Sequence, residues 1–272
     1  MKLSIIIVSF NTKRLTENAI NSILSEGSKI SKEIIVVDNN SEDGSVEMLK
    51  GYSSELKYFR IILNNGNLGF AKANNQAIKT AKGEYILLLN PDTIVKKGAL
   101  GKLLEFAEKV PDAGVVGPRL LNADGTLQKS CYRFPTVWLA IKKYWFRQKG
   151  NFEQFAPAGK VPVTVDALVG AAFLITPKAF KKVGILDERY ALYFEDIDYC
   201  RRVAKSGLKV YYFPGAEIVH LVGASGKKLA DAKNQWRRLI PSSKIYHGIM
   251  GHYLLTLVLL LGQKWEKLLK RN

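Results

Sequence analysis

Short runs of β-branched apolar residues recur at regular intervals through the first half of the sequence, and this spacing constrains the fold more than any other feature. The first run, residues 3–8, is long enough for a buried strand and too short for a helix. The stretch that follows places Leu15, Ala19 and Ile23 at helical spacing. The alternation continues, with strands predicted at 3–8, 33–37, 58–63 and 85–89 and helices at 12–24, 41–49, 69–81 and 98–110. This order predicts an α/β fold with a mostly parallel sheet flanked by helices.

The second half of the sequence is less regular. A helix is predicted at 194–206, opening with acidic residues, and Ser41 is a candidate N-cap for the earlier helix at 41–49. Residues 131–159 are aromatic and basic, which indicates a flexible or membrane-facing insertion. The predicted strands are at 115–120, 128–132, 168–175, 210–213 and 217–220.

The charge of the chain is strongly positive, because 41 Lys and Arg stand against 24 Asp and Glu, for a net charge of +17. Such a surface favours nucleic acid, anionic lipid headgroups or phosphorylated substrates. Two cysteines exclude a disulfide scaffold or a four-thiolate zinc site, and three histidines exclude a His-rich metal cage. We expect cytosolic residence, since no secretory signal is visible and no stretch approaches the roughly 20 apolar residues of a membrane span.

Polar residues follow all four strands of the predicted parallel sheet. Because the carboxyl ends of parallel strands meet at one edge, where ligands of such sheets bind, these side chains are expected to converge. Asn, Asp and Gly also build turns, but four such loops on one edge favour a binding site. The residues concerned are Ser9, Phe10 and Asn11; Asp38 and Asn40; Asn67 and Gly69; and Asn90 and Asp92.

Two groups of titratable residues are candidates for chemistry. Asp92, after a buried strand, suits a divalent cation that also grips a diphosphate. Glu195, Asp196 and Asp198 lie at a helix N-terminus, where the helix dipole already favours acids, but their mutual repulsion also suits a general base. His220 is a lone histidine after a strand. Neither a dinucleotide-binding fingerprint nor a GxxxxGK[ST] phosphate loop is present.

Seven segments, in order and covering roughly residues 1–225, resemble the family 2 glycosyltransferases, and within them the bacterial rhamnosyltransferase-like branch. They are SIIIVSFN (4–11), IIVVDNNSEDGS (34–45), NNGNLGFAKANNQAI (64–78), YILLLNPDT (85–93), VGAAFLITPKAF (169–180), YFEDIDYCRR (193–202) and HLVGAS (220–225). The resemblance implies a Rossmann-like GT-A fold over residues 1–225. It also implies transfer of one sugar from a nucleotide donor with inversion, using Mg²⁺ or Mn²⁺.

The resemblance also assigns roles to individual residues. Asp196, with Glu195 beside it, is implied as the catalytic base, and Asp92 with His220 as the metal site. Asn90 stands where many members carry a carboxylate, so its direct ligation of metal is not expected. Asp198, Arg201 and Trp236 are assigned to acceptor binding or support. The implied donor site comprises Ser9, Phe10, Asn11, Asp38, Asn40, Asn67, Gly69, Asn74, Asn90, Asp92, Gly170 and Ala171.

The C-terminal segment 226–272 is predicted to be a basic, amphipathic extension. It holds apolar residues 253–261 and Trp265 between lysines, a pattern typical of a helix lying at an anionic membrane surface. Packing on the core or a homodimer contact is the alternative. With the resemblance, this favours an enzyme at the inner membrane face acting on a lipid-linked or cell-surface glycan.

Other functions compatible with the sequence are a nucleotidyltransferase and an inactive nucleotide-sugar-binding protein. A nucleic-acid binder is not expected, because its basic residues would line a groove instead of clustering with Leu and Trp. The donor, either a UDP-sugar or a dTDP-sugar such as dTDP-rhamnose, stays open at this point.

Overall fold

A computed structural model describes residues 1–148, 152–221 and 235–269, with the side chains of 235–238 and 269 outside the described set. The strands are β1 (Leu3–Ser9), β2 (Lys32–Asp38), β3 (Phe59–Leu63), β4 (Tyr85–Leu89), β5 (Thr93–Val95), β6 (Ala113–Leu121), β7 (Cys131–Tyr132), β8 (Val163–Val165), β9 (Ala167–Leu168), β10 (Ala172–Ile175) and β11 (Lys209–His220). The helices are α1 (Lys13–Ser25), α2 (Ser45–Glu55), α3 (Phe70–Ile78), α4 (Ala99–Lys109), α5 (Val137–Tyr144), α6 (Pro177–Val183), α7 (Glu195–Lys205) and α8 (Gln235–Leu269).

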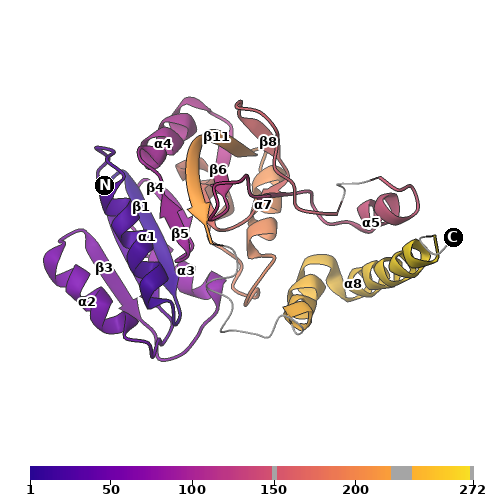
Figure 1. Cartoon of the computed structure of the whole chain (residues 1–272), viewed down its shortest axis with the longest axis horizontal. Coiled ribbons are helices and arrows are strands. Elements are labelled where there is room, and N and C mark those ends of the chain that lie inside the picture. The colour runs from indigo at the N-terminus through magenta and orange to yellow at the C-terminus, as the bar shows by residue number, and fades with distance from the viewer. Residues whose placement is uncertain (149–151, 222–234, 270–272) are drawn as a thin grey trace.

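Nine strands of the described residues form one sheet, in the order β3-β2-β1-β4-β10-β6-β11-β5, with β8 paired to β11 (Figure 1). The predicted parallel order is confirmed for β3, β2, β1 and β4. In the second half β10 runs antiparallel between β4 and β6, so the whole sheet is mixed. The carboxyl ends of the first four strands therefore share one edge, as predicted.

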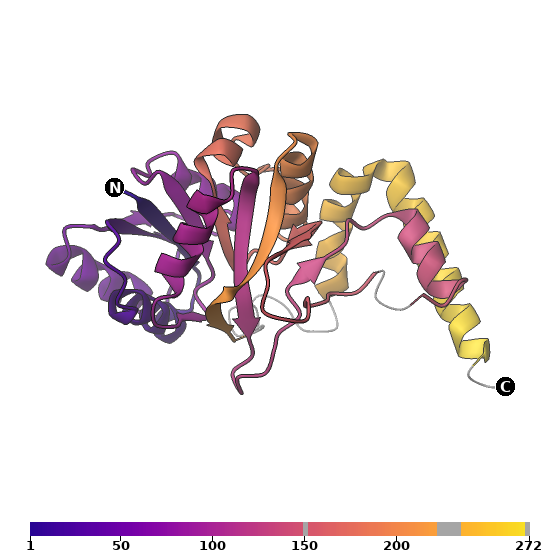
Figure 2. The same ribbon diagram turned by 90° about the horizontal axis from the view of Figure 1, so that it is seen from above.

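Helices cover both faces of the sheet (Figure 2). Along β1, Ile5 and Ile7 pack in one core with residues of α1, α2 and α4, while Ile6 packs in the other with residues of α3, α6 and α7. Successive side chains of a strand point to opposite faces, so a run that is apolar at every position must be buried on both. This double burial is the physical reason for the β-branched runs.

The start of α2 corrects the predicted helix at 41–49. Ser41 does not cap it, because the Asp38 carboxylate accepts hydrogen bonds from the Ser41 backbone N–H (2.8 Å) and hydroxyl (2.7 Å). The helix begins at Ser45, after Gly44 in the left-handed region (φ 80°). The loop after β2 is therefore longer than predicted.

Four strand predictions in the second half were wrong in their bounds. Residues 210–213 and 217–220 form one strand, β11, with a register shift between Phe213 and Glu217. The predicted strand at 168–175 is divided between β9 and β10, and the residues between them, 169–171, make their backbone hydrogen bonds to Ser130, Asp196 and Asn90 instead of continuing the strand. Of residues 128–132, only Cys131 and Tyr132 are in a strand.

The aromatic, basic segment contains the helix α5, whose N-cap Thr136 accepts a hydrogen bond from the Leu139 N–H (3.2 Å). It packs against α8, and the two helices stand away from the body of the molecule (Figures 1 and 2). Within α8, Gly248 has φ 73° and breaks the helix into two straight pieces. Leu239–Leu268 is long and apolar enough to cross a membrane by length and composition alone, which corrects the expectation that no such stretch exists.

Candidate active site

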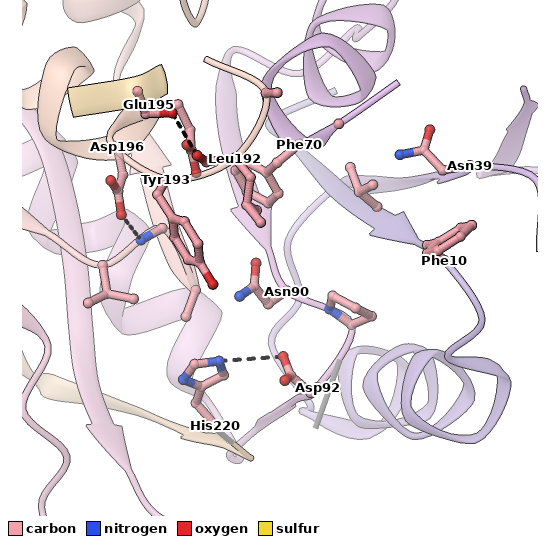
Figure 3. A pocket seen from close by; sticks show the side chains of 18 of the residues that line it. Phe10, Asn39, Phe70, Asn90, Asp92, Leu192, Tyr193, Glu195, Asp196 and His220 are labelled. Atoms are coloured by element: carbon pink, nitrogen blue, oxygen red, sulfur yellow. Dashed lines mark hydrogen bonds and ion pairs between the residues drawn. The ribbon is translucent and has the colours of Figure 1, made fainter. Parts of the chain in front are cut away.

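A cavity of about 850 Å³ lies at the edge where the parallel strands end. Its walls come from the ends of β1, β4 and β11, from loops 67–70 and 189–196, and from the first turns of α8. Figure 3 shows the labelled side chains in three groups: Phe10 and Asn39 at one end, Asn90, Asp92 and His220 in the middle, and Glu195 and Asp196 at the other end. The volume suits a ligand of nucleotide-sugar size.

The first end of the cavity holds Phe10, which follows β1, and Asn39, which follows β2. The Asn39 amide donates to Asn67 Oδ1 (3.3 Å) and accepts from the Asn64 amide (2.9 Å). An aromatic face beside fixed amide groups is suited to a planar ring with polar edges. Asn39 belongs to the polar loop predicted at this edge but was not assigned to the donor site, unlike its neighbours Asp38 and Asn40.

Five predicted donor residues do not line the cavity but shape the loops behind it. Ser9 is buried and its hydroxyl pairs with Thr12, and Asn74 donates to the Phe70 carbonyl (2.9 Å). The Asn11 side chain accepts from the Glu42 N–H (2.8 Å). The Asp38 carboxylate accepts hydrogen bonds from Ser41, as described above. Asn40 is an exposed turn residue with φ 70°.

Gly69 is required by the way loop 67–70 packs on loop 189–196. Its φ is 82°, and a Cβ there would lie 2.5 Å from the Ala191 carbonyl oxygen. The next residue, Phe70, donates its N–H to that same oxygen (3.1 Å). Both loops therefore reach the cavity as one wall, with the Phe70 ring facing inward (Figure 3).

Asp92 and His220 meet in the middle of the cavity. The Asp92 Oδ1 and His220 Nε2 atoms are 3.4 Å apart, and both residues are buried. Gln128 fixes the ring: its Nε2 donates to the His220 carbonyl (3.0 Å) and to Asn122 Oδ1 (2.9 Å), so its Oε1 is the acceptor for His220 Nδ1 (2.8 Å). His220 Nδ1 therefore carries a proton, and Nε2 is the ring atom that faces Asp92; in the neutral imidazole this atom carries the lone pair. Nothing in the sequence signalled Gln128.

A carboxylate oxygen beside an imidazole lone pair is a donor set that fits a divalent cation such as Mn²⁺ or Mg²⁺. Among the described residues, no cluster of three or more His, Cys, Asp and Glu side chains is arranged to hold a metal. Asp92 and His220 would supply two ligands, and a bound diphosphate and water can supply others.

Glu195 and Asp196 open α7 at the far end of the cavity, where Glu195 is buried and Asp196 is partly exposed. Burial raises the pKa of Glu195 to about 8, with the neighbouring Asp196 charge adding to the shift. Burial also raises the pKa of Asp196, but the N–H groups of Gly170 (2.9 Å) and Ile197 (2.8 Å) donate to its carboxylate and oppose the shift. Asp196 therefore ionises before Glu195, which leaves one charged and one neutral acid side by side.

Gly170 and Ala171 line the cavity between these two groups, as predicted. Besides the N–H of Gly170 on Asp196, the Ala171 carbonyl accepts from the Asn90 N–H (2.9 Å). The backbone of 170–171 therefore links the end of β4 to the start of α7. It thus connects the part of the cavity that holds Asp92 to the part that holds Asp196.

The turn before α7 has two consecutive non-glycine residues in the left-handed region, Tyr193 (φ 67°) and Phe194 (φ 70°). The Phe194 ring packs on Tyr246 of α8, with centroids 5.2 Å apart. The Tyr193 ring, also missed by the sequence analysis, points into the cavity between Asp196 and Asn90 (Figure 3). Backbone strain of this kind persists only where surrounding packing enforces it, and it is typical of functional sites.

The residues assigned to acceptor binding or support lie behind the cavity wall. Asp198 is buried and pairs with Arg201 (3.0 Å) and Arg202 (2.8 Å). The Arg201 guanidinium stacks on the Tyr246 ring, 3.9 Å from its centroid. The two ion pairs lie within α7, and the contact of Arg201 with Tyr246 ties α7 to α8. The side chain of Trp236 lies outside the described residues.

The first turns of α8 form part of the cavity wall through Pro241 and Ser242. The Ser242 hydroxyl donates to the Leu192 carbonyl (2.8 Å) and so holds the loop that precedes Glu195. Part of the segment predicted as a separate extension thus completes the candidate site. Most of the predicted motif at 220–225 lies outside the described residues.

Comparison with known proteins shows the family of the chain. The family model described as "Glycosyl transferase family 2" matches residues 4–183. The chain is similar to N-acetylglucosaminyl-diphospho-decaprenol L-rhamnosyltransferase of Mycobacterium tuberculosis, at 28% identity over 69% of the chain and 66% of that protein. It is also similar to the dTDP-rhamnosyl transferase RfbF of Shigella flexneri, at 26% identity over 82% of the chain and 70% of that protein.

Solved structures show the same fold. GalNAc-T7 with UDP, GalNAc and Mn²⁺ aligns over 84% of the chain and 45% of its own length, with a TM-score of 0.64 and 17% identity. The mannosyltransferase PcManGT of Pyrobaculum calidifontis, in complex with GDP-Man and Mn²⁺, covers 94% of the chain and 64% of its own, with a TM-score of 0.60 and 16% identity. The chain has the GT-A fold and belongs to glycosyl transferase family 2.

Proposed function

We propose that this protein transfers one sugar from a nucleotide-sugar donor to a lipid-linked or cell-surface glycan acceptor, with inversion at the anomeric carbon. A single observation carries the proposal: one cavity brings the Asp92 and His220 pair together with the acids Glu195 and Asp196. The first pair would bind the cation that accompanies a diphosphate, and the second pair would activate the acceptor hydroxyl.

A dTDP-sugar is the first donor to test, and dTDP-rhamnose is the first among these. The two relatives described above are named as rhamnosyltransferases, one of them for dTDP-rhamnose. A UDP-sugar is the second, since GalNAc-T7 was solved with UDP. In either case, the base would stack on Phe10 with Asn39 beside it, and the diphosphate would reach Asp92.

Asp92 and His220 would hold a divalent cation, which when bound neutralises the charge that develops on the departing diphosphate. Asp196 acts at the other end of the cavity. Its carboxylate takes the proton from the acceptor hydroxyl, whose oxygen forms the new bond to the anomeric carbon as the bond to the diphosphate breaks. Attack from the opposite face in one displacement inverts the configuration, and it requires only one base.

The neutral Glu195 beside Asp196 suits the same reaction. Its Oε2 is buried and has no hydrogen-bond partner among the described residues, so a protonated carboxyl avoids the cost of a buried, unpaired charge. With Glu195 neutral, the negative charge stays on Asp196, where the base is needed.

The proposed setting is the cytoplasmic face of a membrane. The mycobacterial relative is named for an acceptor that contains a diphospho-decaprenol, which is a lipid carrier. The exposed apolar helix α8 is compatible with a lipid-linked acceptor of this kind.

The decisive measurement is thermal stabilisation by dTDP, UDP and their sugars, with and without Mn²⁺ or Mg²⁺. We expect a metal-dependent rise in Tm for wild type with one nucleotide, lost in Asp92→Ala. Asp196→Asn serves as the control: it should keep the ligand-induced rise while losing about 10³-fold in transfer. Absence of any rise in wild type would contradict the proposal, and pyrophosphate release from a nucleoside triphosphate would identify a nucleotidyltransferase instead.

A further inference from the structure

We propose that the outer faces of α8 and α5 form one docking surface for an anionic lipid bilayer, on which α8 lies in the plane of the interface. The proposal rests on side-chain exposure, helix length and charge, and only its consequence for the acceptor rests on the proposed function. The two helices pack side by side and project from the body of the molecule (Figures 1 and 2).

The outer face of α8 beyond Gly248 is a continuous apolar stripe. His252 and Leu255 are buried, so one side of the helix faces the protein. Up to Leu261, the exposed side chains on the opposite side recur every three or four residues and are all apolar or aromatic; they are Ile249, Met250, Tyr253, Leu254, Leu257, Leu260 and Leu261, between 49% and 87% exposed. Beyond them, Trp265 and Leu268 are exposed among the charged residues Lys264, Glu266 and Lys267. A contiguous apolar surface of this kind marks a docking site and not an ordinary soluble surface.

Helix α5 extends the same surface. Gly262 of α8 faces the Tyr144 ring, and a Cβ at Gly262 would collide with it, so the two helices are in close contact. Trp138, Trp145 and Phe146 are exposed in and just after α5. Amphipathic aromatic rings such as Trp prefer the headgroup level of a bilayer, where one part of the ring is wet and the other is apolar.

The charge around this surface complements anionic lipid. Residues 133–148 and 239–269 contain seven Lys and Arg and one acid, Glu266. Of these cations, Lys143 is paired with Glu153 (2.8 Å) outside the two segments, and Lys142 and Lys244 lie over the rings of Trp138 and Tyr253. The seven are Arg133, Lys142, Lys143, Arg147, Lys244, Lys264 and Lys267.

Helix length favours an interfacial position over a span. Between the kink at Gly248 and Lys264, α8 has 15 uncharged residues. At 1.5 Å per residue these cover about 22 Å, which is short of the roughly 30 Å of a hydrocarbon core. An amphipathic helix flanked by lysines instead buries one face at the headgroup boundary.

The docking surface and the candidate site share one helix. Pro241 and Ser242, at the start of α8, line the cavity, while Phe194 and Arg201 pack on Tyr246 a turn later. A bilayer bound along the second part of α8 would therefore hold the cavity at a fixed place relative to the lipid surface. If the proposed function holds, this places a lipid-linked acceptor next to Asp196.

The test is co-sedimentation of the full chain with vesicles of phosphatidylcholine, alone or with 30% phosphatidylglycerol. We expect binding to the anionic vesicles, at least tenfold weaker binding to the neutral ones, and at least a tenfold loss for the double variant Leu257→Glu/Leu261→Glu. The double reversal Lys264→Glu/Lys267→Glu should reduce binding to anionic vesicles, whereas the matched reversal Lys50→Glu/Lys57→Glu, on exposed lysines in and just after α2, should not.

Fluorescence checks the depth of insertion. Brominated lipid should quench tryptophan emission, and Trp265→Phe should remove part of that quenching. Unchanged vesicle binding in the leucine variant would overturn the proposal. So would resistance of the wild type to alkaline extraction, which indicates a span, or a stable dimer that only the leucine variant dissociates, which indicates a self-interface.

The two proposals fail separately. The leucine variant should keep the nucleotide-induced rise in Tm of the wild type, because the substitutions are far along α8 from Pro241 and Ser242. Vesicle binding without any nucleotide effect in the wild type would leave the docking surface intact and contradict the proposed function.

Discussion

At the residue scale, the site depends on a small number of side chains whose orientation is fixed by their hydrogen bonds. His220 is the clearest case. The two donor bonds of the Gln128 amide force its oxygen toward His220 Nδ1, and the remaining ring nitrogen must then face Asp92. Such partners behind a metal ligand set its tautomer and its orientation.

Gln128→Leu tests this arrangement. Loss of the amide frees the His220 ring, so metal-dependent binding of the nucleoside diphosphate should weaken about 10- to 100-fold. Isothermal titration with dTDP or UDP and Mn²⁺ measures it. Gln263→Leu, at an exposed position of α8 away from the cavity, is the matched control and should bind as the wild type does. Equal affinity in Gln128→Leu would show that His220 needs no such partner.

Glu195 makes a prediction about pH. Its folded pKa is about 8, above the roughly 4.3 of an unfolded glutamate, so the folded state retains a proton that the unfolded state loses. The contribution of this group to stability is therefore full below about pH 4.3 and is lost as pH rises toward 8. Glu195→Gln removes this pH-dependent contribution. The free energy of unfolding of the variant, relative to that of the wild type, should therefore increase between pH 5 and 8 by up to about 4 kcal/mol.

Urea denaturation of both proteins across that pH range measures the difference. The wild-type curve contains the titration of every other group, but the difference between the two curves isolates residue 195. A difference that stays constant with pH would mean that Glu195 titrates normally in the fold.

At the scale of elements, the cavity is made by loops that pack on one another. Loop 67–70 meets loop 189–196 through the Ala191 carbonyl, and the latter is held in turn by Ser242 and by the Phe194 ring on α8. The strain at Tyr193 and Phe194 is stored where these contacts are densest. The geometry of Asp196 is therefore a property of three elements together.

Gly69→Ala tests the packing of the two loops. A methyl group there adds an unfavourable φ and a collision with the backbone of Ala191, so stability should fall by about 1–3 kcal/mol and donor binding should weaken. The urea midpoint measures it. Gly66→Ala is the control in the same loop, because a Cβ at Gly66 meets nothing within 4 Å. Similar small effects in both variants would show that the loops pack loosely.

At the scale of the whole molecule, a mixed α/β body carries the cavity, and the α5 and α8 pair projects from it (Figure 1). The body is held by apolar cores on both faces of the sheet, whereas the projecting part depends on the contact between two helices. In the apolar 18-residue window of α8, only 22% is buried inside the protein, whereas a helix in the core of a soluble protein is mostly buried. The integrity of the projection is therefore set by the α5–α8 contact.

Two helix glycines give opposite predictions for this contact. Gly51→Ala in α2 places a methyl group in open space and should stabilise the protein by about 0.5–1 kcal/mol. Gly262→Ala in α8 has the same helical preference but meets the Tyr144 ring, so it should destabilise α5–α8 packing. Thermal unfolding gives the sign, and hydrogen exchange of residues 137–144 locates the effect. Stabilisation by both substitutions would mean that the two helices separate easily.

The sequence by itself determined the parallel half of the sheet and the edge where polar residues gather. Burial on both faces requires runs such as 3–8, and parallel strands necessarily end together, so Phe10, Asn67, Asn90 and Asp92 could be placed at one cavity. The order of motifs likewise pointed to the family that the comparisons show.

Tertiary structure alone decided which side chains face the cavity and which only support it. The sequence pattern could not show that Asn39 lines the cavity and Asp38 does not. The Asp38 carboxylate is bound by Ser41 through contacts that form only when the loop folds. Gln128, Tyr193 and Ser242 carry no local signal, since their positions depend on contacts between segments distant in sequence. Propensity and periodicity act within one helix or strand, so the sequence can predict the elements and the sheet edge where their ends lie. A site forms where several elements meet, so the side chains that face it are decided only by the tertiary structure.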